Sequence, residues 1–341
     1  MNNIDKNFNN LTKTIEKLSS DEIFYNIRHK YLSLNDELKN SLEDYFRRFN
    51  YWGTLDYKNN DFSEIYEKAL SLKNHLEDYV WLYQRLGDYR SKKLLFAILN
   101  NWYQYDFDNL ERSRELNFND YFDLDLVKCE NEVLVDLGAY TGDTTLDYIK
   151  TYGQNSYKKI YCFEITEETF SLLKNNLSEY PNIEFIRKAA SDKKGVMYIN
   201  SNPTDSSANT ISDEGSVKIE ATSLDEEITE PITTIKMDIE GAEQSAIIGA
   251  KNHIKNDKPK LLLSVYHNNE DLWKIPRMIE EICPGYKFYL RNHGGGIFPT
   301  EITLIGIFKN NSWLFKIKND KIINANDTCS ASARKSDYGT G

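Results

Sequence analysis

The sequence predicts an α/β fold, in which an open and mainly parallel sheet carries helices on both faces and follows a helical region. From Glu132 onward, short apolar runs alternate with stretches whose apolar residues recur at helical spacing, which is the pattern of a parallel sheet. Before Glu132 the apolar residues follow the helical period alone. With 40% hydrophobic and 13% aromatic residues, the 341-residue chain can fill a large core, which argues against disorder.

Residues 1–125 are predicted to form a helical domain. Apolar residues between Ile65 and Tyr83 lie on one helix face, and a second such face runs from Leu94 to Trp102. Gly87 between them predicts a helix end, so the two helices should form an antiparallel hairpin. This region carries no chemical motif, and we expect it to act as a cap or as a surface for homo-oligomerisation. Further helices are expected at 8–18 and 20–48.

The rest of the chain divides into a sheet domain at 126–323 and a flexible, small and polar tail at 324–341. No helix separates the last two predicted strands, so they should form an antiparallel hairpin at the sheet edge. A long polar loop at 201–216 is a candidate lid. Strands are expected at 133–138, 159–164, 182–187, 196–200, 233–239, 260–266, 286–291 and 301–308, and helices at 167–177, at 243–254 and in the segment ending at Ile282.

The composition excludes several classes of protein. A net charge of −11 argues against a nucleic-acid partner and against docking on an anionic membrane surface. No apolar stretch approaches the roughly 18 residues of a membrane span, and no secretory signal follows Met1, so membrane insertion is not expected. The four cysteines are too far apart for a CxxC pair and too few for a disulfide scaffold. A reduced, cytoplasmic protein is therefore expected.

The turn after the first strand, residues 136–144, indicates the kind of ligand that the sheet binds. Ligands of such folds lie at the carboxyl ends of the strands. The dinucleotide fingerprint G-x-G-x-x-G is absent, because Tyr140 stands where its second glycine is required. Asp136 and Asp143 flank the turn, where they would repel a pyrophosphate and attract a cationic ligand. The alternative for Asp143 is a helix cap that needs no cofactor.

Glu164 ends the second strand and is placed to accept both ribose hydroxyls of a nucleoside. S-adenosylmethionine fits this combination, because it carries a nucleoside, a sulfonium and an ammonium but no phosphate. The alternative for Glu164 is a solvated strand end, and Ala189 is expected at the edge of the adenine. The expected cofactor-binding residues are Asp136, Gly138, Ala139, Tyr140, Thr141, Gly142, Asp143, Thr144, Glu164, Ala189 and Asp238.

Several segments together resemble the FkbM family of S-adenosylmethionine-dependent methyltransferases. The resemblance spans about residues 132–308, and its most family-specific piece is a K-x-D-x-E-G-x-E octapeptide. It implies a class I methyltransferase fold, with a seven-stranded sheet whose last hairpin is antiparallel. It also implies O-methylation, often of hydroxyls on sugars or natural products. The segments are 136–144, Phe163-Glu164, the octapeptide at 236–243, Tyr266-His267, Asp271-Leu272-Trp273 and 291–293.

Methyl transfer to an alcohol is an in-line displacement that gains from a general base. We expect His267 to be this base, because an unperturbed imidazole titrates near neutral pH. The alternative is a hydrogen-bonded histidine at a strand end. Asp238 is expected to face the methionine ammonium or the acceptor hydroxyl, and Glu240 to orient the acceptor. The expected substrate-binding residues are Glu243, His293 and Ser206, although Glu243 can also serve simply to start a helix.

Asp238, Glu240 and His267 would also suit Mg²⁺ or Mn²⁺. No H-x-x-x-H motif or compact carboxylate cluster supports a metal, so metal-free catalysis is expected. The leading function is O-methylation of a small-molecule or glycan acceptor. N-methylation of an amino sugar or peptide stays open, and so does a binding module with a relict cofactor site. Tyr140 and Asp143 argue against an NAD(P) oxidoreductase.

Overall fold

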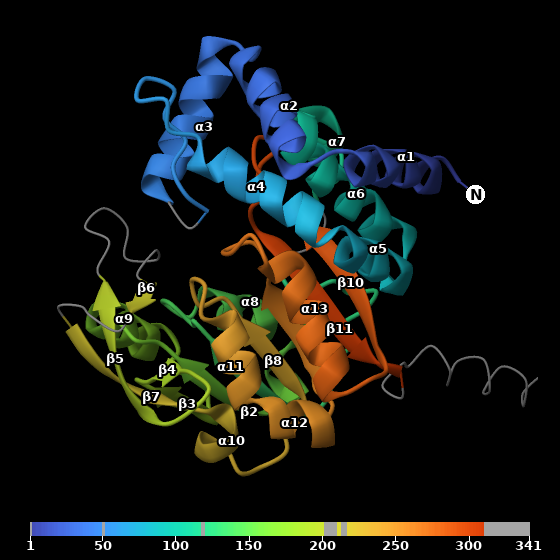
Figure 1. Cartoon of the computed structure of the whole chain (residues 1–341). Coiled ribbons are helices and arrows are strands. Elements are labelled where there is room, and N and C mark those ends of the chain that lie inside the picture. Colours follow the sequence, from blue (N-terminus) through green and yellow to red (C-terminus); the bar gives the residue numbers. More distant parts are fainter. Residues whose placement is uncertain (1, 50–51, 117–119, 201–209, 213–216, 310–341) are drawn as a thin grey trace, which may run out of the picture. The chain divides into compact units, whose positions relative to one another are not determined.

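The computed structural model describes residues 2–49, 52–116, 120–200, 210–212 and 217–309. The strands of its central sheet are β1 (Glu132–Leu137), β2 (Tyr157–Phe163), β3 (Ile183–Ile186), β8 (Thr234–Met237), β9 (Lys260–Ser264), β10 (Tyr286–Asn292) and β11 (Ile302–Phe308). Their order is β10-β11-β9-β8-β1-β2-β3 (Figure 1). Strand β11 is antiparallel to both of its neighbours, and the other pairs are parallel. The predicted α/β fold, with seven strands and an antiparallel last hairpin, is confirmed.

Different helices cover the two faces of this sheet (Figure 1). Successive residues of a strand point to opposite faces, so Val133 and Val135 join one apolar cluster and Leu134 joins the other. The helix predicted at 243–254 is interrupted at Ala250, whose backbone (φ −108°, ψ 10°) leaves the helical region. The first face carries α11 (Glu243–Gly249), α12 (Lys251–Asn256) and α13 (Asp271–Ile282), and the second carries α8 (Asp143–Tyr152) and α9 (Glu167–Asn176).

A second, smaller sheet was missed by the sequence analysis, apart from its strand near residues 196–200. It has the order β4-β7-β5-β6. Within the expected polar loop at 201–216, residues 210–212 pair with β5 as a strand, and the remainder lies outside the described residues. The elements are β4 (Ala189–Ala190), β5 (Gly195–Asn200), β6 (Thr210–Ser212) and β7 (Val217–Thr222), with α10 (Leu224–Glu227) after them and the short 3-10 turn η1 (Gln154–Ser156) elsewhere.

The N-terminal region is helical, as predicted. The expected helix at 20–48 is two helices, because Asn35 caps a new one with its side-chain oxygen. The pattern from Ile65 to Tyr83 is likewise interrupted at His75. No helix in the described ranges has the length and apolar character to cross a bilayer. The helices are α1 (Asn3–Lys17), α2 (Ser20–Leu32), α3 (Asp36–Arg48), α4 (Ser63–Asn74), α5 (Leu76–Arg85), α6 (Tyr89–Gln104) and α7 (Phe107–Glu111).

The helical region packs directly against the edge strand β10 of the central sheet (Figure 1). The backbone N–H of Gly87 donates to the carbonyl of Phe288 at 2.8 Å, and Glu115 N–H donates to Asn292 at 2.7 Å. One apolar cluster contains side chains of these helices and of the sheet, and the described residues up to Phe308 belong to one compact unit. The division at residue 125 into two domains stays a prediction, and the expected tail at 324–341 lies outside the described residues.

Candidate active site

A cavity of about 320 Å³ opens at the carboxyl edge of the central sheet, where β1, β2, β8 and β9 end. This volume is at the lower end of the range for pockets that bind small organic ligands. The edge is also the place where folds of this kind bind their ligands. The expected cofactor residues that line it are Gly138, Tyr140, Asp143, Thr144, Glu164, Ala189 and Asp238.

The turn after β1 is shaped by close contact between two backbone segments. Gly138 has a positive φ of 76°, and a Cβ at this position would lie 1.8 Å from the carbonyl oxygen of Asp238. Only glycine fits such an approach. Tyr140 also has a positive φ of 47°, and its N–H donates to Glu164 Oε2 at 3.1 Å. The turn is therefore tied to both neighbouring strand ends before any ligand is considered.

The Glu164 carboxylate is held in one orientation by protein donors. Besides the Tyr140 N–H, it accepts hydrogen bonds at Oε1 from the Thr166 N–H and the Thr169 hydroxyl, both at 2.8 Å. The side chain is 8% exposed and lines the cavity. Because each carboxylate oxygen has two lone pairs, Oε1 is saturated, and Oε2 retains capacity to accept one hydroxyl group of a ligand.

Asp136 lies behind the turn rather than in the lining of the cavity. Lys236 Nζ is 2.9 Å from Asp136 Oδ1 and also donates to the carbonyl of Gly138 at 2.8 Å. The Thr145 hydroxyl donates to the second carboxylate oxygen of Asp136 at 2.8 Å. Burial raises the pKa of Asp136, although Lys236 opposes the shift. Asp136 and Lys236 thus form a buried ion pair that holds the Gly138 turn against β8.

Three other expected cofactor residues also lie outside the lining of the cavity. Ala139 is buried, Gly142 immediately precedes α8, and Thr141 lies between them. They build the turn that carries the lining residues. Asp143 is the first residue of α8, is exposed and lines the cavity. The N-cap is Gly142 and no side chain caps the helix, so the alternative of a capping Asp143 is wrong.

His267 is surrounded by acidic side chains just behind the cavity. Its Nδ1 is 2.9 Å from Glu243 Oε1, and its Nε2 is 3.4 Å from Asp238 Oδ1 and 3.5 Å from Glu240 Oε2. Burial alone would lower the pKa of His267, but the three carboxylates outweigh it and raise the pKa well above its ordinary value. The side chain is 1% exposed and does not line the cavity, whereas Asp238 and Glu240 do.

Asp238, Glu240 and His267 are also the residues that could hold a divalent cation. One possible ligand atom from each lies within 4.8 Å of the others. A protonated imidazole that pairs with carboxylates would give the same short distances, so these distances do not by themselves indicate a metal.

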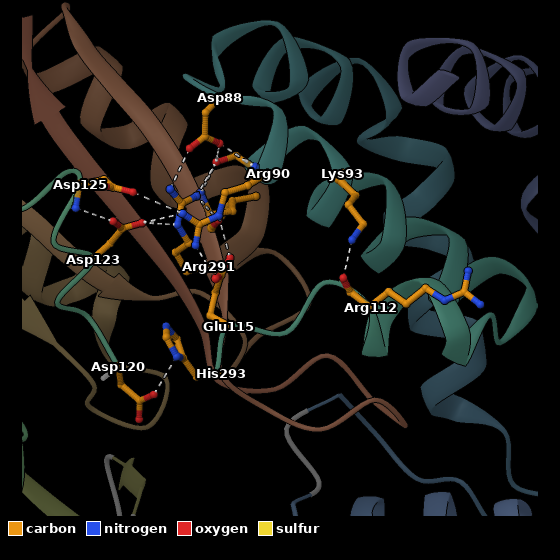
Figure 2. A network of polar contacts seen from close by, with 12 residues as sticks. Asp88, Arg90, Lys93, Arg112, Glu115, Asp120, Asp123, Asp125, Arg291 and His293 are labelled. Atoms are coloured by element: carbon orange, nitrogen blue, oxygen red, sulfur yellow. Dashed lines mark hydrogen bonds and ion pairs between the residues drawn. The ribbon is translucent and has the colours of Figure 1, made fainter. Parts of the chain in front are cut away.

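The three expected substrate-binding residues do not gather at the cavity. Glu243 is buried at the start of α11, where its carboxylate also accepts from the Ile239 N–H at 2.9 Å. His293 Nδ1 is 3.2 Å from Asp120 Oδ1 (Figure 2), and His293 is not among the lining residues. Ser206 lies outside the described residues.

Two residues of the site were missed by the sequence analysis. The Tyr121 hydroxyl donates to Asp238 Oδ2 at 2.7 Å, and Glu301 lines the cavity and accepts from the Tyr266 hydroxyl at 3.2 Å. Although the Glu301 side chain reaches solvent, surrounding protein and the neighbouring Asp238 raise its pKa to about 7. Neither residue belongs to a motif, and only the fold brings them to the end of β8.

Comparisons with known proteins agree with this geometry. Residues 136–294 match the model of the methyltransferase FkbM domain. The structure is similar to that of methyltransferase FkbM from Methylobacillus flagellatus, at 26% identity and a TM-score of 0.60. That match covers 77% of this chain, and this chain spans 65% of the length of that structure.

Other solved structures are more distant. Fibrillarin from Aeropyrum pernix, with natively bound S-adenosyl-L-methionine, shows 12% identity and a TM-score of 0.36, with 58% of this chain and 72% of that one covered. Fibrillarin from Methanococcus jannaschii shows 13% identity and a TM-score of 0.37, and the match covers 58% of this chain and 73% of that chain. No curated protein matches the chain. Residues 136–294 of this chain therefore carry a methyltransferase FkbM domain.

Proposed function

We propose that this protein is an S-adenosylmethionine-dependent methyltransferase. The observation that carries the proposal is the fixed Glu164 carboxylate, which faces a cavity built around the Gly138 turn. A carboxylate at this place suits a hydroxyl of a ribose. The other acidic lining residues suit a ligand with positive charge and no phosphate. The FkbM domain over residues 136–294 supports the same assignment.

The residues present fit the parts of this cofactor. Glu164 would accept a ribose hydroxyl at Oε2, Ala189 would border the adenine, and the part of the cavity beside Gly138 would take the methionine part. Asp238 would bind the methionine ammonium, since its carboxylate lines the same cavity beside Gly138. When bound, the cofactor supplies a methyl group attached to a positively charged sulfur.

The protein itself has to align the acceptor and take up its proton. Asp238 and Glu240 both line the cavity. With Asp238 assigned to the ammonium, Glu240 is the proposed contact to the acceptor and the candidate proton acceptor. His267 lies behind both carboxylates and is held by Glu243. We therefore propose that His267 orients these carboxylates and stabilises their charge, a role different from the base that the sequence analysis expected.

The proposed acceptor is a hydroxyl on a sugar, a glycan or a secondary metabolite. A carboxylate such as that of Glu240 accepts hydrogen bonds from hydroxyl groups, which supports this choice. N-methylation of an amino sugar or a peptide is the second candidate. It is favoured by Glu301, which adds a third acidic side chain to the same end of the cavity and would attract an amine.

Two wider proposals concern the setting of the protein. A cytoplasmic location is supported by Cys129, Cys162 and Cys283, which are free thiols. Homo-oligomerisation through the N-terminal helices is supported by the exposed aromatic side chains of Tyr25 and Tyr66 on α2 and α4.

Calorimetric titration with S-adenosylmethionine, S-adenosylhomocysteine and NAD tests the proposed function. We expect saturable heat with both adenosyl ligands and none with NAD. Glu164→Ala should weaken both adenosyl ligands by roughly 10- to 100-fold, because a hydrogen bond from a ribose hydroxyl to a charged carboxylate is lost. Glu184→Ala is the matched control, because this carboxylate on the neighbouring strand β3 is half exposed and pairs with Lys159 outside the cavity. Absence of heat with either adenosyl ligand would refute the proposed function.

Removal of divalent cations should leave the site intact. Asp238 and Glu240 lie within direct contact distance of His267, so no cation is needed to hold the three side chains together. We expect EDTA to leave the affinity for S-adenosylhomocysteine unchanged, and titration with MnCl₂ to give no saturable heat. Saturable Mn²⁺ binding that is lost in Glu240→Gln would show instead that these residues form a metal site.

A further inference from the structure

We propose that Tyr121 is a positioning residue of this site, which holds the Asp238 carboxylate in the orientation that binds the methionine ammonium. Tyr121 belongs to the segment that joins the N-terminal helices to β1, so the helical region would help to build the site. The inference rests on the proposed function and goes beyond it, since no motif assigns a role to this segment.

The contacts of Tyr121 place its hydroxyl directly on Asp238. The hydroxyl donates to Asp238 Oδ2 at 2.7 Å and lies 3.1 Å from the hydroxyl of Ser264. The side chain is 6% exposed, and the Lys236 ammonium lies 5.4 Å from the centre of its ring. Burial and the Asp238 charge raise the pKa of Tyr121 well above its usual value, so the hydroxyl remains a proton donor at neutral pH.

The backbone of Tyr121 is held in an unfavourable conformation. Its φ is 68°, in the left-handed region that is sterically unfavourable for a bulky residue. Such a conformation persists only where the surroundings impose it, and it occurs often at functional sites. Here the strained backbone carries the phenol that contacts Asp238.

A buried ion-pair network fixes the chain two residues further on (Figure 2). Arg291 on β10 donates from Nε to Asp123 Oδ2 at 2.5 Å and from Nη2 to Asp88 Oδ2 at 2.7 Å. Asp88 also caps α6 by accepting from the Ser91 N–H at 2.8 Å. One guanidinium thus connects the start of α6, the strand β10 and the segment that carries Tyr121.

The network explains how the N-terminal helices can affect Asp238, through the segment that joins them to β1. Asp123 and Arg291 are each 2% exposed, so their contact is shielded from water and is geometrically specific. With Asp123 anchored, Tyr121 has little freedom to withdraw from Asp238. Its phenol therefore fixes one carboxylate oxygen of Asp238, while His267 Nε2 faces the other at 3.4 Å.

The test is Tyr121→Phe, which removes the hydroxyl and keeps the ring. We expect this variant to bind S-adenosylhomocysteine about tenfold more weakly, the usual scale for losing one hydrogen bond to a charged group. Binding of 5′-methylthioadenosine, which lacks the amino-acid part, should stay unchanged. A general structural defect would weaken both ligands alike, so calorimetry with the pair separates positioning of Asp238 from loss of structure.

Two further variants make the test specific. Tyr157→Phe removes a hydroxyl that donates to the carbonyl of Pro181 at the opposite end of β2, and should bind both ligands as the unaltered chain does. In an Asp238→Asn background, Tyr121→Phe should have no additional effect on S-adenosylhomocysteine. Two outcomes would overturn this inference but not the proposed function. One is a tenfold weakening by Tyr121→Phe in the Asp238→Asn background, and the other is an unchanged affinity of the single variant Tyr121→Phe for S-adenosylhomocysteine. Failure of the unaltered chain to bind S-adenosylhomocysteine would overturn the proposed function as well.

Discussion

Replacing Lys236 by methionine is expected to lower the free energy of unfolding by about 3–5 kcal/mol. Methionine retains much of the length of the side chain but removes the charge that neutralises Asp136. The Asp136 carboxylate is 1% exposed, so it would remain in the interior without its counter-ion. The Gly138 carbonyl would also lose its 2.8 Å hydrogen bond. Urea denaturation followed by tryptophan fluorescence measures the loss.

The double variant Lys236→Met with Asp136→Leu should be clearly more stable than Lys236→Met, because no unpaired charge is then buried. Lys158→Met is the matched control. Its ammonium pairs with Glu230 at the surface, with 67% of the lysine side chain exposed, so its removal should cost about 1 kcal/mol or less. A loss for Lys236→Met no larger than for Lys158→Met would contradict the role given to the buried pair.

Gly138→Ala is expected to weaken S-adenosylhomocysteine binding by at least about 100-fold and to destabilise the protein by more than about 2 kcal/mol. The added Cβ would lie 1.8 Å from the Asp238 carbonyl oxygen, so β1 and β8 would have to move apart where the cavity begins. Alanine is also strained at a φ of 76°. Calorimetry and urea denaturation measure the two effects.

Gly153→Ala is the control that distinguishes the steric clash with Asp238 from the strain of a positive φ. Gly153 has a similar positive φ of 83°, but no atom lies within 4 Å of the position that a Cβ would take. Its ψ of 159° places it in a region that is essentially restricted to glycine, so this control should lose about 1–3 kcal/mol of stability but retain full binding. If Gly138→Ala behaved in the same way, the close approach to Asp238 would not be needed for the cavity.

Much of the sheet could be predicted from local patterns. A buried parallel strand needs a short apolar run, and β1, β2 and β9 all show one, so their positions were predicted within two or three residues. The small second sheet was largely missed. Strand β7 has polar residues at alternate positions within a long polar stretch, and its short partner β4 has only two residues.

At the site, too, residues within local motifs were predicted, whereas properties that depend on distant residues were not. The turn residue Gly138 and the strand-end residues Glu164 and Asp238 were predicted, and they do line the cavity. From its sequence context, His267 was expected to act as the base with an unperturbed imidazole. Its pKa depends on three carboxylates around it, and no spacing rule reveals how deeply they surround it.

The sequence by itself determined the α/β fold, the carboxyl edge at which the cavity lies, and the family motifs, because each depends on residues within one strand–turn–helix unit. Only the tertiary structure decided that Asp136 is paired with Lys236 behind the turn. It also decided that Tyr121 contacts Asp238, 117 positions further along the chain. Such contacts depend on how distant segments pack, and the hydrophobic period of a single segment does not predict that packing.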